Sequence, residues 1–212
     1  MNACHRCGRT AHFHDRRTGS FLCPKHARIE VVAARQGSPR DRHHDVTMAS
    51  DADSEAIISI AVHLWGEATV DCFDRSFEID GLPALVVRET DCIAALLVFD
   101  LLGSDYVVLM LAVLAGAQGR GMAKALLQEV CDRARNAGAT RLLIATSNDD
   151  LPALALYQQY GFVLESVYPG LLLAHHGGEE LGFAGIPVRD EIRLSYELAP
   201  GTGGCERDVQ SD

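Results

Sequence analysis

Hydrophobic and polar positions along residues 45–198 repeat with two different periods, so this part of the chain is predicted to contain both strands and helices. Runs rich in apolar and β-branched residues predict strands at 45–50, 82–88, 92–100, 106–114, 140–146, 162–167 and 191–198. Apolar residues at helical spacing predict helices over 53–65, 121–136 and 151–160. Short polar turns separate the second, third and fourth strands, which indicates an antiparallel meander. We therefore expect an α+β fold, in which helices flank a mostly antiparallel mixed sheet.

The two ends of the chain differ in composition from this central part. Residues 37–44 contain Pro39 among mixed charges and are expected to form a linker. Residues 200–212 are polar and rich in glycine, and are expected to form a disordered tail. Hydrophobic residues make up 48% of the 212 residues, which is enough for a substantial core. The sequence thus predicts one main domain at 45–199, preceded by a small segment at 1–36.

Charge is distributed unevenly along the chain. Residues 1–43 contain nine Lys or Arg and three Asp or Glu, a formal charge of +6, whereas the remaining residues contain 10 and 26, a formal charge of −16. Binding to nucleic-acid phosphates needs clustered cations, so the acidic main domain is not expected to bind nucleic acid. The basic segment is able to bind an anion or to dock on the acidic domain. Two parts of opposite charge indicate two different tasks.

The sequence has neither the pattern of a membrane span nor that of a secretory signal. The longest apolar run, residues 106–117, is interrupted by Gly116 and is shorter than the roughly 20 residues that a spanning helix needs. The first ten residues do not contain the apolar core of a signal peptide. We therefore expect a cytoplasmic protein without a membrane partner.

Cysteine and histidine residues cluster near the start of the chain. Four of them have the spacing of a zinc site, with two ligands on each of two tight turns: Cys4, Cys7, Cys23 and His26. Residues 1–36 have too few large apolar side chains to form a core, so bound zinc would supply the folding energy. The alternatives are surface residues without a role and a disulfide, which would leave one of these three cysteines unpaired. Either His12 or His14 is able to replace His26. The prediction is a small zinc knuckle that holds structural Zn²⁺.

The most informative stretch is a glycine-rich loop between a predicted strand and a predicted helix. Gly116, Gly119 and Gly121 follow the strand at 106–114, and the helix begins at the last of them. Glycine lets the backbone approach a ligand closely, and a helix start offers unpaired N–H groups and a positive dipole end. The loop lacks the Gly-Lys-Ser/Thr ending of a P-loop and the spacing of a dinucleotide-binding GxGxxG motif. It is expected to bind a pyrophosphate, or else to be a plain tight turn.

Two motifs give this loop a more specific interpretation. The first is Gln118-x-x-Gly121-x-Ala123. The second is Asn-x4-Ala-x2-Leu-Tyr-x3-Gly-Phe, which starts at Asn148 and contains Tyr157. In this order, and separated by a helix and a strand, they resemble the two signature motifs of the GNAT superfamily of N-acetyltransferases. The resemblance covers most of the chain, from the first predicted strand to the last, and leaves out the Cys/His segment.

The resemblance implies a GNAT-like fold and acetyl-CoA as the bound co-substrate. Backbone groups of three strand residues are expected to pair with the pantetheine arm: Leu111, Ala112 and Val113. Six loop residues are expected to wrap the pyrophosphate: Gln118, Gly119, Arg120, Gly121, Met122 and Ala123. Asn148 is expected to contact the pantetheine or a water molecule bound to it, unless it only caps the end of a strand. Tyr157 is expected to contact the coenzyme, and Arg120 or Lys124 adds positive charge unless its side chain is solvated. The stretches at 63–66 and 185–194 resemble a bacterial subgroup, which adds no substrate.

Acetyl transfer from a thioester to an amine needs a polarised carbonyl, a neutral amine and a proton for the leaving thiolate. A backbone N–H at 111–113 is expected to polarise the carbonyl. Tyr157 matches the tyrosine that many superfamily members use as the acid, unless it only packs against the coenzyme. Many members carry a glutamate on the strand before the loop; here that strand has only Asp105, at its start, which is the predicted catalytic base unless it is only a turn residue. Alternative bases are His175, His176, Glu179, Glu191 and a water relay.

The function that the resemblance implies is direct transfer of an acetyl group from acetyl-CoA to a primary amine of a small molecule. The acidic domain suits a cationic acceptor. One alternative is a protein N-acetyltransferase that uses the zinc segment to dock a protein partner. Another is a non-catalytic acyl-CoA-binding module, and a homodimer also stays open.

Overall fold

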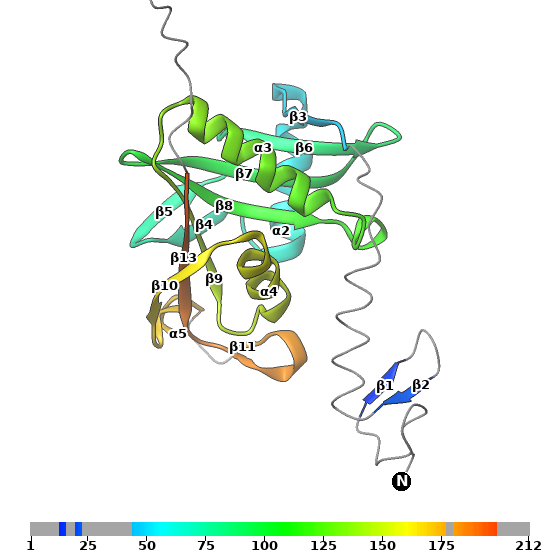
Figure 1. Ribbon diagram of the computed structural model, residues 1–212, viewed down its shortest axis with the longest axis vertical. Helices are drawn as coiled ribbons and strands as arrows, with labels where there is room; N and C mark the ends of the chain where they lie inside the picture. The colour runs from blue at the N-terminus through cyan, green and yellow to red at the C-terminus, as the bar shows by residue number, and fades with distance from the viewer. Residues whose placement is uncertain (1–12, 16–19, 23–43, 177–179, 199–212) are drawn as a thin grey trace, which may run out of the picture. The chain divides into compact units, whose positions relative to one another are not determined.

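The computed structural model describes residues 13–15, 20–22, 44–176 and 180–198, and the chain divides into two units, Met1–Arg42 and His43–Asp212 (Figure 1). In the first unit, β1 (Phe13–Asp15) pairs antiparallel with β2 (Ser20–Leu22). The residues predicted to bind zinc lie outside the described residues: Cys4, Cys7, Cys23 and His26. The zinc knuckle therefore stays a prediction.

The second unit contains the elements that the hydrophobic pattern predicts. Its strands are β3 (Val46–Met48), β4 (Thr69–Cys72), β5 (Arg75–Glu78), β6 (Ala84–Glu89), β7 (Cys92–Leu102), β8 (Asp105–Val113), β9 (Arg141–Ser147), β10 (Val163–Tyr168), β11 (Glu180–Leu181), β12 (Pro187–Val188) and β13 (Glu191–Glu197). Its helices are α2 (Ser54–Trp65), α3 (Met122–Asn136), α4 (Leu151–Tyr160) and α5 (Leu171–His176). Each predicted helix and strand is present. Among the described residues, no helix is long and apolar enough to cross a membrane.

Seven strands form one sheet in the order β10-β13-β9-β8-β7-β6-β3. Neighbouring strands pair antiparallel, except β8 and β9, which are parallel. The strands β6, β7 and β8 follow one another in the chain and in the sheet, so the predicted meander is confirmed. Helices flank the sheet (Figure 1), which confirms the α+β class with a mostly antiparallel mixed sheet.

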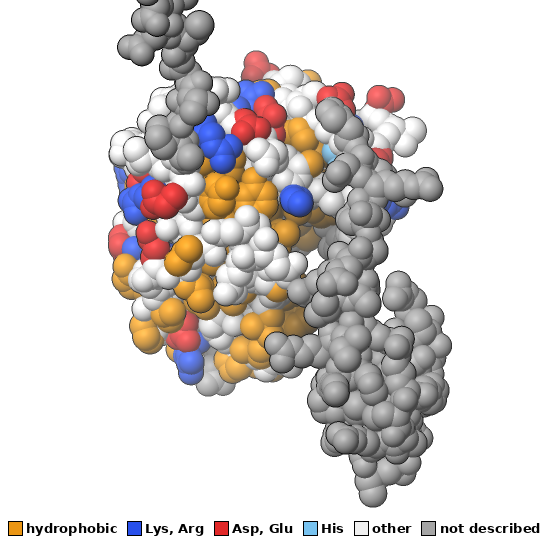
Figure 2. Space-filling model, viewed as in Figure 1, with side chains coloured by type: hydrophobic (Ala, Val, Ile, Leu, Met, Phe, Trp, Pro, Cys, Tyr) orange, Lys and Arg blue, Asp and Glu red, His pale blue; other side chains and the backbone are white. Residues whose placement is uncertain are grey.

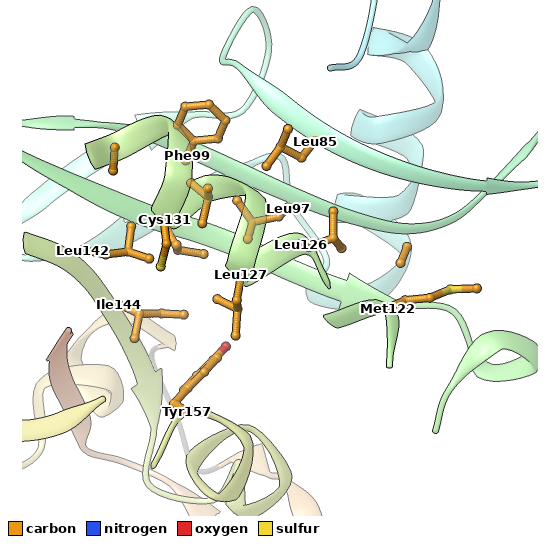
Figure 3. Packing of buried hydrophobic residues seen from close by; sticks show 14 of the residues in the cluster. Leu85, Leu97, Phe99, Met122, Leu126, Leu127, Cys131, Leu142, Ile144 and Tyr157 are labelled. Atoms are coloured by element: carbon orange, nitrogen blue, oxygen red, sulfur yellow. The ribbon is translucent and has the colours of Figure 1, made fainter. Parts of the chain in front are cut away.

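The two faces of this sheet are covered by different elements. On one face, Leu126 of α3 belongs to the same buried cluster as Ile144 of β9 (Figure 3). On the other face, Ile57 of α2 belongs to a cluster with residues of β6, β7 and β8. The β4–β5 hairpin also covers this second face, where its Phe77 lies in a cluster with Leu143 of β9. We call these the α3 face and the hairpin face.

The two parallel strands in the middle of the sheet separate after a short paired stretch. β8 pairs with β9 only where Tyr106–Val108 faces Leu142–Ile144. The ladder between β7 and β8 is irregular at the same level, because Leu109 has no Cα partner on β7. Such a β-bulge bends and twists the strand. The later part of β8 therefore diverges from β9, and its backbone groups on that side have no strand partner.

Two regions contain structure that the hydrophobic pattern did not predict. The β4–β5 hairpin turns through Phe73 and Asp74, which both have positive φ, 52° and 59°. The segment between β10 and β13 contains α5, β11 and β12. The strands in these regions have two to four residues, too few for an alternating pattern to be recognised.

Strand β10 forms one edge of the sheet. Its residues Val163, Leu164 and Val167 are exposed, and Figure 2 shows hydrophobic side chains on the lower part of the surface. An unpaired strand edge with apolar side chains is a place where another chain is able to add. The predicted homodimer stays a prediction.

Candidate active site

The glycine-rich loop joins the diverging end of β8 to the start of α3. β8 ends at Val113, a short turn at 115–117 follows, and α3 begins at Met122. Gly119 and Gly121 have φ values of 74° and 91°, in the region that favours glycine. Gly121 is the N-cap of α3, and no side chain caps the helix. The first N–H groups of α3 are therefore open to an anion at the positive end of the helix dipole.

Side-chain hydrogen bonds hold the loop in this shape. Gln118 Nε2 donates to the backbone oxygen of Val113 at 3.0 Å. The guanidinium of Arg120 donates to Glu89 at the end of β6, at 2.7 Å, and to the backbone oxygen of Gly116, at 2.6 Å. The loop is thus fastened to two strand ends by the side chains of its own motif.

The two predicted cations of the loop are in different situations. The guanidinium of Arg120 is engaged in these hydrogen bonds within the protein. The group of Arg120 that is left to bind an anion is therefore its backbone N–H. Lys124 is exposed in the first turn of α3 and has no ion pair with another described residue. His44, predicted to belong to the linker, has its Nε2 2.7 Å from the backbone oxygen of Arg120. Linker composition gave no signal for this contact.

Tyr157 is a buried residue of α4. Its ring packs against Phe162, with 5.8 Å between ring centroids, and the residue is 6% exposed. Figure 3 shows the hydroxyl of Tyr157 directed toward Leu127 of α3. Burial raises the pKa of Tyr157 well above its usual value, and the charge of Asp150 adds to this shift. The phenol is therefore neutral and carries its proton. Within the described residues, its hydroxyl has no hydrogen-bond partner.

Asn148 is engaged with the protein itself. Its side-chain oxygen accepts hydrogen bonds from the backbone N–H groups of Arg189 and Asp190, both at 2.8 Å. Its side-chain nitrogen donates to the backbone oxygen of Pro187 at 3.0 Å. Asn148 therefore fastens the end of β9 to the start of β13, and the amide keeps one N–H for another partner. Its predicted contact with the pantetheine stays a prediction.

Asp105 is distant from the place where a thioester is expected. It starts β8, six residues before Leu111, which is about 20 Å along a strand. One carboxylate oxygen accepts from Thr140 at 3.0 Å, and the other accepts from Arg141 at 2.6 Å and 3.1 Å. This position and this pairing do not fit a base at the reacting carbon, so we do not carry Asp105 into the mechanism.

The predicted pantetheine partners lie on the diverging part of β8. Leu111, Ala112 and Val113 all pair with β7 on one side and have no pairing to β9 on the other. The bulge at Leu109 lies just before them. A bulge leaves backbone groups unpaired, so Leu109 is a further candidate to polarise a carbonyl. No sequence pattern marks it, because a bulge depends on the register of two strands.

The other predicted bases lie between β10 and the start of β13. His175 and His176 end α5, and Glu179 lies outside the described residues. Glu191 is the first residue of β13 and is 3% exposed.

Two buried aspartates fasten this segment to the sheet. Asp149 accepts a hydrogen bond from the backbone N–H of Phe183 at 3.0 Å. Asp190 accepts one from the backbone N–H of Gly170 at 2.8 Å. The segment is therefore held near its start at Gly170 and again at Phe183, although its own helix and strands are short.

Metal-ligating side chains are not gathered in the described ranges. Across these ranges, no group of three or more His, Cys, Asp or Glu residues is arranged to hold a metal ion.

Burial raises the pKa of the Cys72 thiol to about 12, and the nearby charge of Glu191 acts in the same direction. Cys72 is therefore a neutral, unreactive thiol rather than a nucleophile or ligand.

Several known proteins are similar to this chain in sequence or in structure. The sequence model of the Acetyltransferase (GNAT) family matches residues 48–162. The Uncharacterized protein YdhI of Bacillus subtilis (strain 168) is 30% identical over 125 residues, which are 57% of this chain and 76% of that protein. The Uncharacterized N-acetyltransferase YvbK of the same strain is 31% identical over 91 residues, 43% of this chain and 58% of that protein. A GNAT family acetyltransferase from Elizabethkingia anophelis, solved with acetyl-CoA bound, superposes with a TM-score of 0.57 at 18% identity, covering 74% of this chain and 100% of that chain.

A parallel strand pair that separates beside an uncapped helix start offers unpaired strand backbone groups and open helix N–H groups, which are able to bind an extended ligand with an anionic group. The matched family agrees with this geometry and makes it specific. The chain belongs to the Acetyltransferase (GNAT) family and is an acetyl-CoA-dependent acetyltransferase. The resemblance inferred from the two motifs is confirmed for the second unit, and the alternative of a non-catalytic binding module is set aside.

Proposed function

We propose that this enzyme transfers an acetyl group directly from acetyl-CoA to a primary amine of a small molecule. The observation that carries the proposal is the excess of carboxylates in the acetyltransferase unit, 26 acidic against 10 basic residues after residue 43. Clefts lined by one sign of charge concentrate ligands of the other sign. The expected acceptors are therefore cationic amines, such as a polyamine, an amino acid or an amine-bearing antibiotic.

The coenzyme is proposed to lie along the diverging end of β8, with its pyrophosphate at the start of α3. The backbone N–H groups of six loop residues would bind the pyrophosphate: Gln118, Gly119, Arg120, Gly121, Met122 and Ala123. The exposed ammonium of Lys124 would add charge. Three strand residues would pair with the pantetheine: Leu111, Ala112 and Val113. Asn148 would donate its remaining N–H to the pantetheine or to a water molecule bound to it.

Tyr157 is proposed to protonate the leaving thiolate. The amine nitrogen attacks the thioester carbon, a C–N bond forms, and the C–S bond breaks. The thiolate then takes the phenolic proton, which the tyrosine regains from solvent. The support for this role is the neutral, buried phenol of Tyr157, whose hydroxyl has no other partner among the described residues. A free thiol has a pKa near 8.5 and a free tyrosine one near 10, so the transfer costs about 2 kcal/mol, and burial of the phenol adds to this.

The first unit is proposed to bind one structural Zn²⁺ and to leave the chemistry to the second unit. The motivation is the ligand spacing in the sequence. Its ligands would be Cys4, Cys7, Cys23 and His26. Docking of a protein substrate through this unit is the competing function, and the positive charge of residues 1–43 is the observation that favours it.

The test is an acceptor screen with the full chain, in which release of the coenzyme thiol is followed and products are checked for the added acetyl mass. The panel contains a polyamine, free amino acids, an amine-bearing antibiotic, and peptides with a free N-terminus or a lysine. We expect a small amine to have the highest kcat/KM. Turnover of peptides alone would favour the protein acetyltransferase, and binding of acetyl-CoA without turnover of any amine would contradict both.

A further inference from the structure

The buried carboxylate of Glu191 lies on the hairpin face of the sheet, opposite α3. The register of β13 and β9 places Glu191 opposite Ser147, and Ser195 opposite Leu143. Leu143 belongs to the buried cluster under the β4–β5 hairpin. Side chains alternate along a strand, so Glu191, Arg193 and Ser195 share the hairpin face.

Glu191 is also at the level where β8 and β9 separate. The last paired residues of the two strands are Val108 and Ile144. Three residues further, about 10 Å along each strand, lie Leu111 on β8 and Ser147 on β9. Glu191 of β13 pairs with Ser147 of β9, and β9 neighbours β8. Glu191 therefore lies two strands away from Leu111, at the same level along the sheet. The proposed coenzyme enters at the start of α3, and the acceptor therefore has the hairpin face left to approach the thioester.

Four acidic residues are buried in the described part of the chain, and three of them use both carboxylate oxygens. Asp105 is bonded by Thr140 and Arg141, as described above. Asp149 accepts from the Ser147 hydroxyl on one oxygen and from a backbone N–H on the other. Asp190 accepts from the Arg189 guanidinium on both oxygens. None of these three has an oxygen left for a substrate.

Glu191 differs from them, because one of its oxygens is free. Its Oε1 accepts a hydrogen bond from Nε of Arg193, and no described residue donates to its Oε2. In the described ranges, Arg193 Nη2 is the one side-chain nitrogen or oxygen that is fully buried and has no hydrogen-bond partner. The unpartnered Oε2 of Glu191 therefore keeps some solvent-exposed surface, although the residue is 97% buried.

Arg193 fixes the orientation of this carboxylate. Its Nη1 donates to Asp74 at the tip of the β4–β5 hairpin, at 3.1 Å. Its Cζ lies 3.9 Å from the ring centroid of Tyr168 and 5.0 Å from that of Phe73. Two carboxylates around one guanidinium leave a net charge of −1, which attracts an ammonium group. Arg193 is thus a positioning residue that occupies one oxygen of Glu191 and leaves the other for the acceptor.

We infer that Glu191 is the catalytic base that deprotonates the acceptor amine. This inference rests on the proposed function. The acceptor enters as an ammonium ion and gives one proton to Oε2 of Glu191, directly or through one water molecule. The neutral amine attacks the thioester, the C–N bond forms, and its second proton passes to solvent. The thiolate leaves with the proton of Tyr157 on the α3 face. Glu191 returns its proton to solvent, so one proton is released for each acetyl group transferred. The acid and the base thus act from opposite faces of the sheet.

The test compares Glu191→Gln with Glu197→Gln in the full chain. Both changes replace a carboxylate of β13 by an amide, but Glu197 is exposed at the other end of the strand. The probes are primary amines of decreasing basicity that the parent acetylates. For the most basic amine we expect kcat to fall about 10²-fold or more in Glu191→Gln, with acetyl-CoA affinity unchanged. The loss should shrink as amine basicity falls, because a weakly basic amine arrives already neutral. The Glu197→Gln protein should stay within twofold of the parent.

Several outcomes would overturn the assignment of Glu191. A Glu191→Gln protein within threefold of the parent would do so, and so would an equal loss for every amine, which indicates only a structural role. If this variant does not fold, Glu191→Asp keeps the charge and shortens the side chain by one methylene. It should lose about tenfold in kcat, and parental activity would overturn the assignment. A parent that acetylates no amine would instead contradict the proposed function.

Discussion

The two substrates of this enzyme are proposed to meet regions of the protein that are built in different ways. The coenzyme region around Gly121 uses backbone N–H groups, and its shape comes from consecutive residues of one loop. The acceptor region around Glu191 uses side chains, and its shape comes from contacts such as that between Asp74 and Arg193, 119 positions apart. The comparison indicates that a backbone-built site leaves a signature in the sequence, whereas a site built from distant side chains leaves little.

The largest expected effect concerns the proton donor. Tyr157→Phe keeps the buried ring and removes the hydroxyl, so kcat should fall by about 10²–10⁴-fold with little change in acetyl-CoA affinity. The matched control is Tyr160→Phe on the same helix, where the hydroxyl contacts Gln128 and Cys131. That variant should lose stability but keep kcat within threefold. Single-turnover rates with saturating acetyl-CoA measure both, and a Tyr157→Phe protein as active as the control would leave Tyr157 as a packing residue.

The next largest effect tests whether the carboxylate of Asp105 stabilises the fold or acts as the catalytic base. Asp105→Asn weakens the buried bonds to Thr140 and Arg141, so the free energy of unfolding should fall by about 2 kcal/mol. Its kcat should stay within threefold, because the carboxylate is about 20 Å along β8 from Leu111. Urea unfolding and steady-state kinetics test the two statements. A hundredfold loss of kcat in a stably folded protein would restore Asp105 as the base.

A smaller effect is expected at the anchor of the segment between β10 and β13. A Cβ at Gly182 would lie 1.8 Å from Oδ2 of Asp149, so Gly182→Ala must displace this buried carboxylate. We expect a loss of about 1–2 kcal/mol in stability and a higher KM for the acceptor, with acetyl-CoA affinity unchanged. Gly185→Ala is the control in the same hairpin: its φ of 77° makes an alanine strained there, but no atom lies within 4 Å of the added Cβ, so it lowers stability without displacing Asp149. Equal KM values in the two variants would show that this anchor does not shape the acceptor region.

The smallest expected effect is that of zinc on the coenzyme. The full chain should contain one zinc ion by metal analysis, and Cys23→Ser should lower this content. Because the proposed ligands and the coenzyme loop belong to different units, a chelator should change acetyl-CoA affinity by less than twofold. A zinc-free parent would refute the knuckle, whereas loss of coenzyme binding on chelation would refute only the independence of the units.

The fold and the coenzyme loop could largely be predicted from the sequence, and the reasons are local. Helices and long strands of the second unit follow from hydrophobic periods, and the loop follows from the spacing of Gln118 and Gly121. The support of that loop by His44 could not be predicted, since His44 and Arg120 are 76 positions apart. The same holds for the bulge at Leu109, which exists only through strand register.

The assignment of the catalytic base shows the limit of such reasoning most clearly. A charged residue on the strand before the loop led to Asp105, because position along the sequence was the only guide. The hydrogen bonds of the folded chain instead distinguish Asp105, whose oxygens are both used, from Glu191, whose Oε2 is free. The partners of Asp105 lie 35 and 36 positions further along the chain, so no local motif records that its oxygens are used.

The division of the two substrates between the two regions is tested most directly by calorimetric titration of acetyl-CoA into the parent, Gly121→Glu and Glu191→Gln. Gly121 has a φ of 91° at the helix start, so a glutamate there strains the loop and places negative charge beside the pyrophosphate. Gly138→Glu, at a glycine of similar φ (79°) just after α3, controls for the strain alone. We predict at least about a 10²-fold weaker Kd for Gly121→Glu, equivalent to about 2.7 kcal/mol, and parental Kd values for Glu191→Gln and Gly138→Glu. Parental affinity in Gly121→Glu, or an equal loss in Glu191→Gln, would contradict the account.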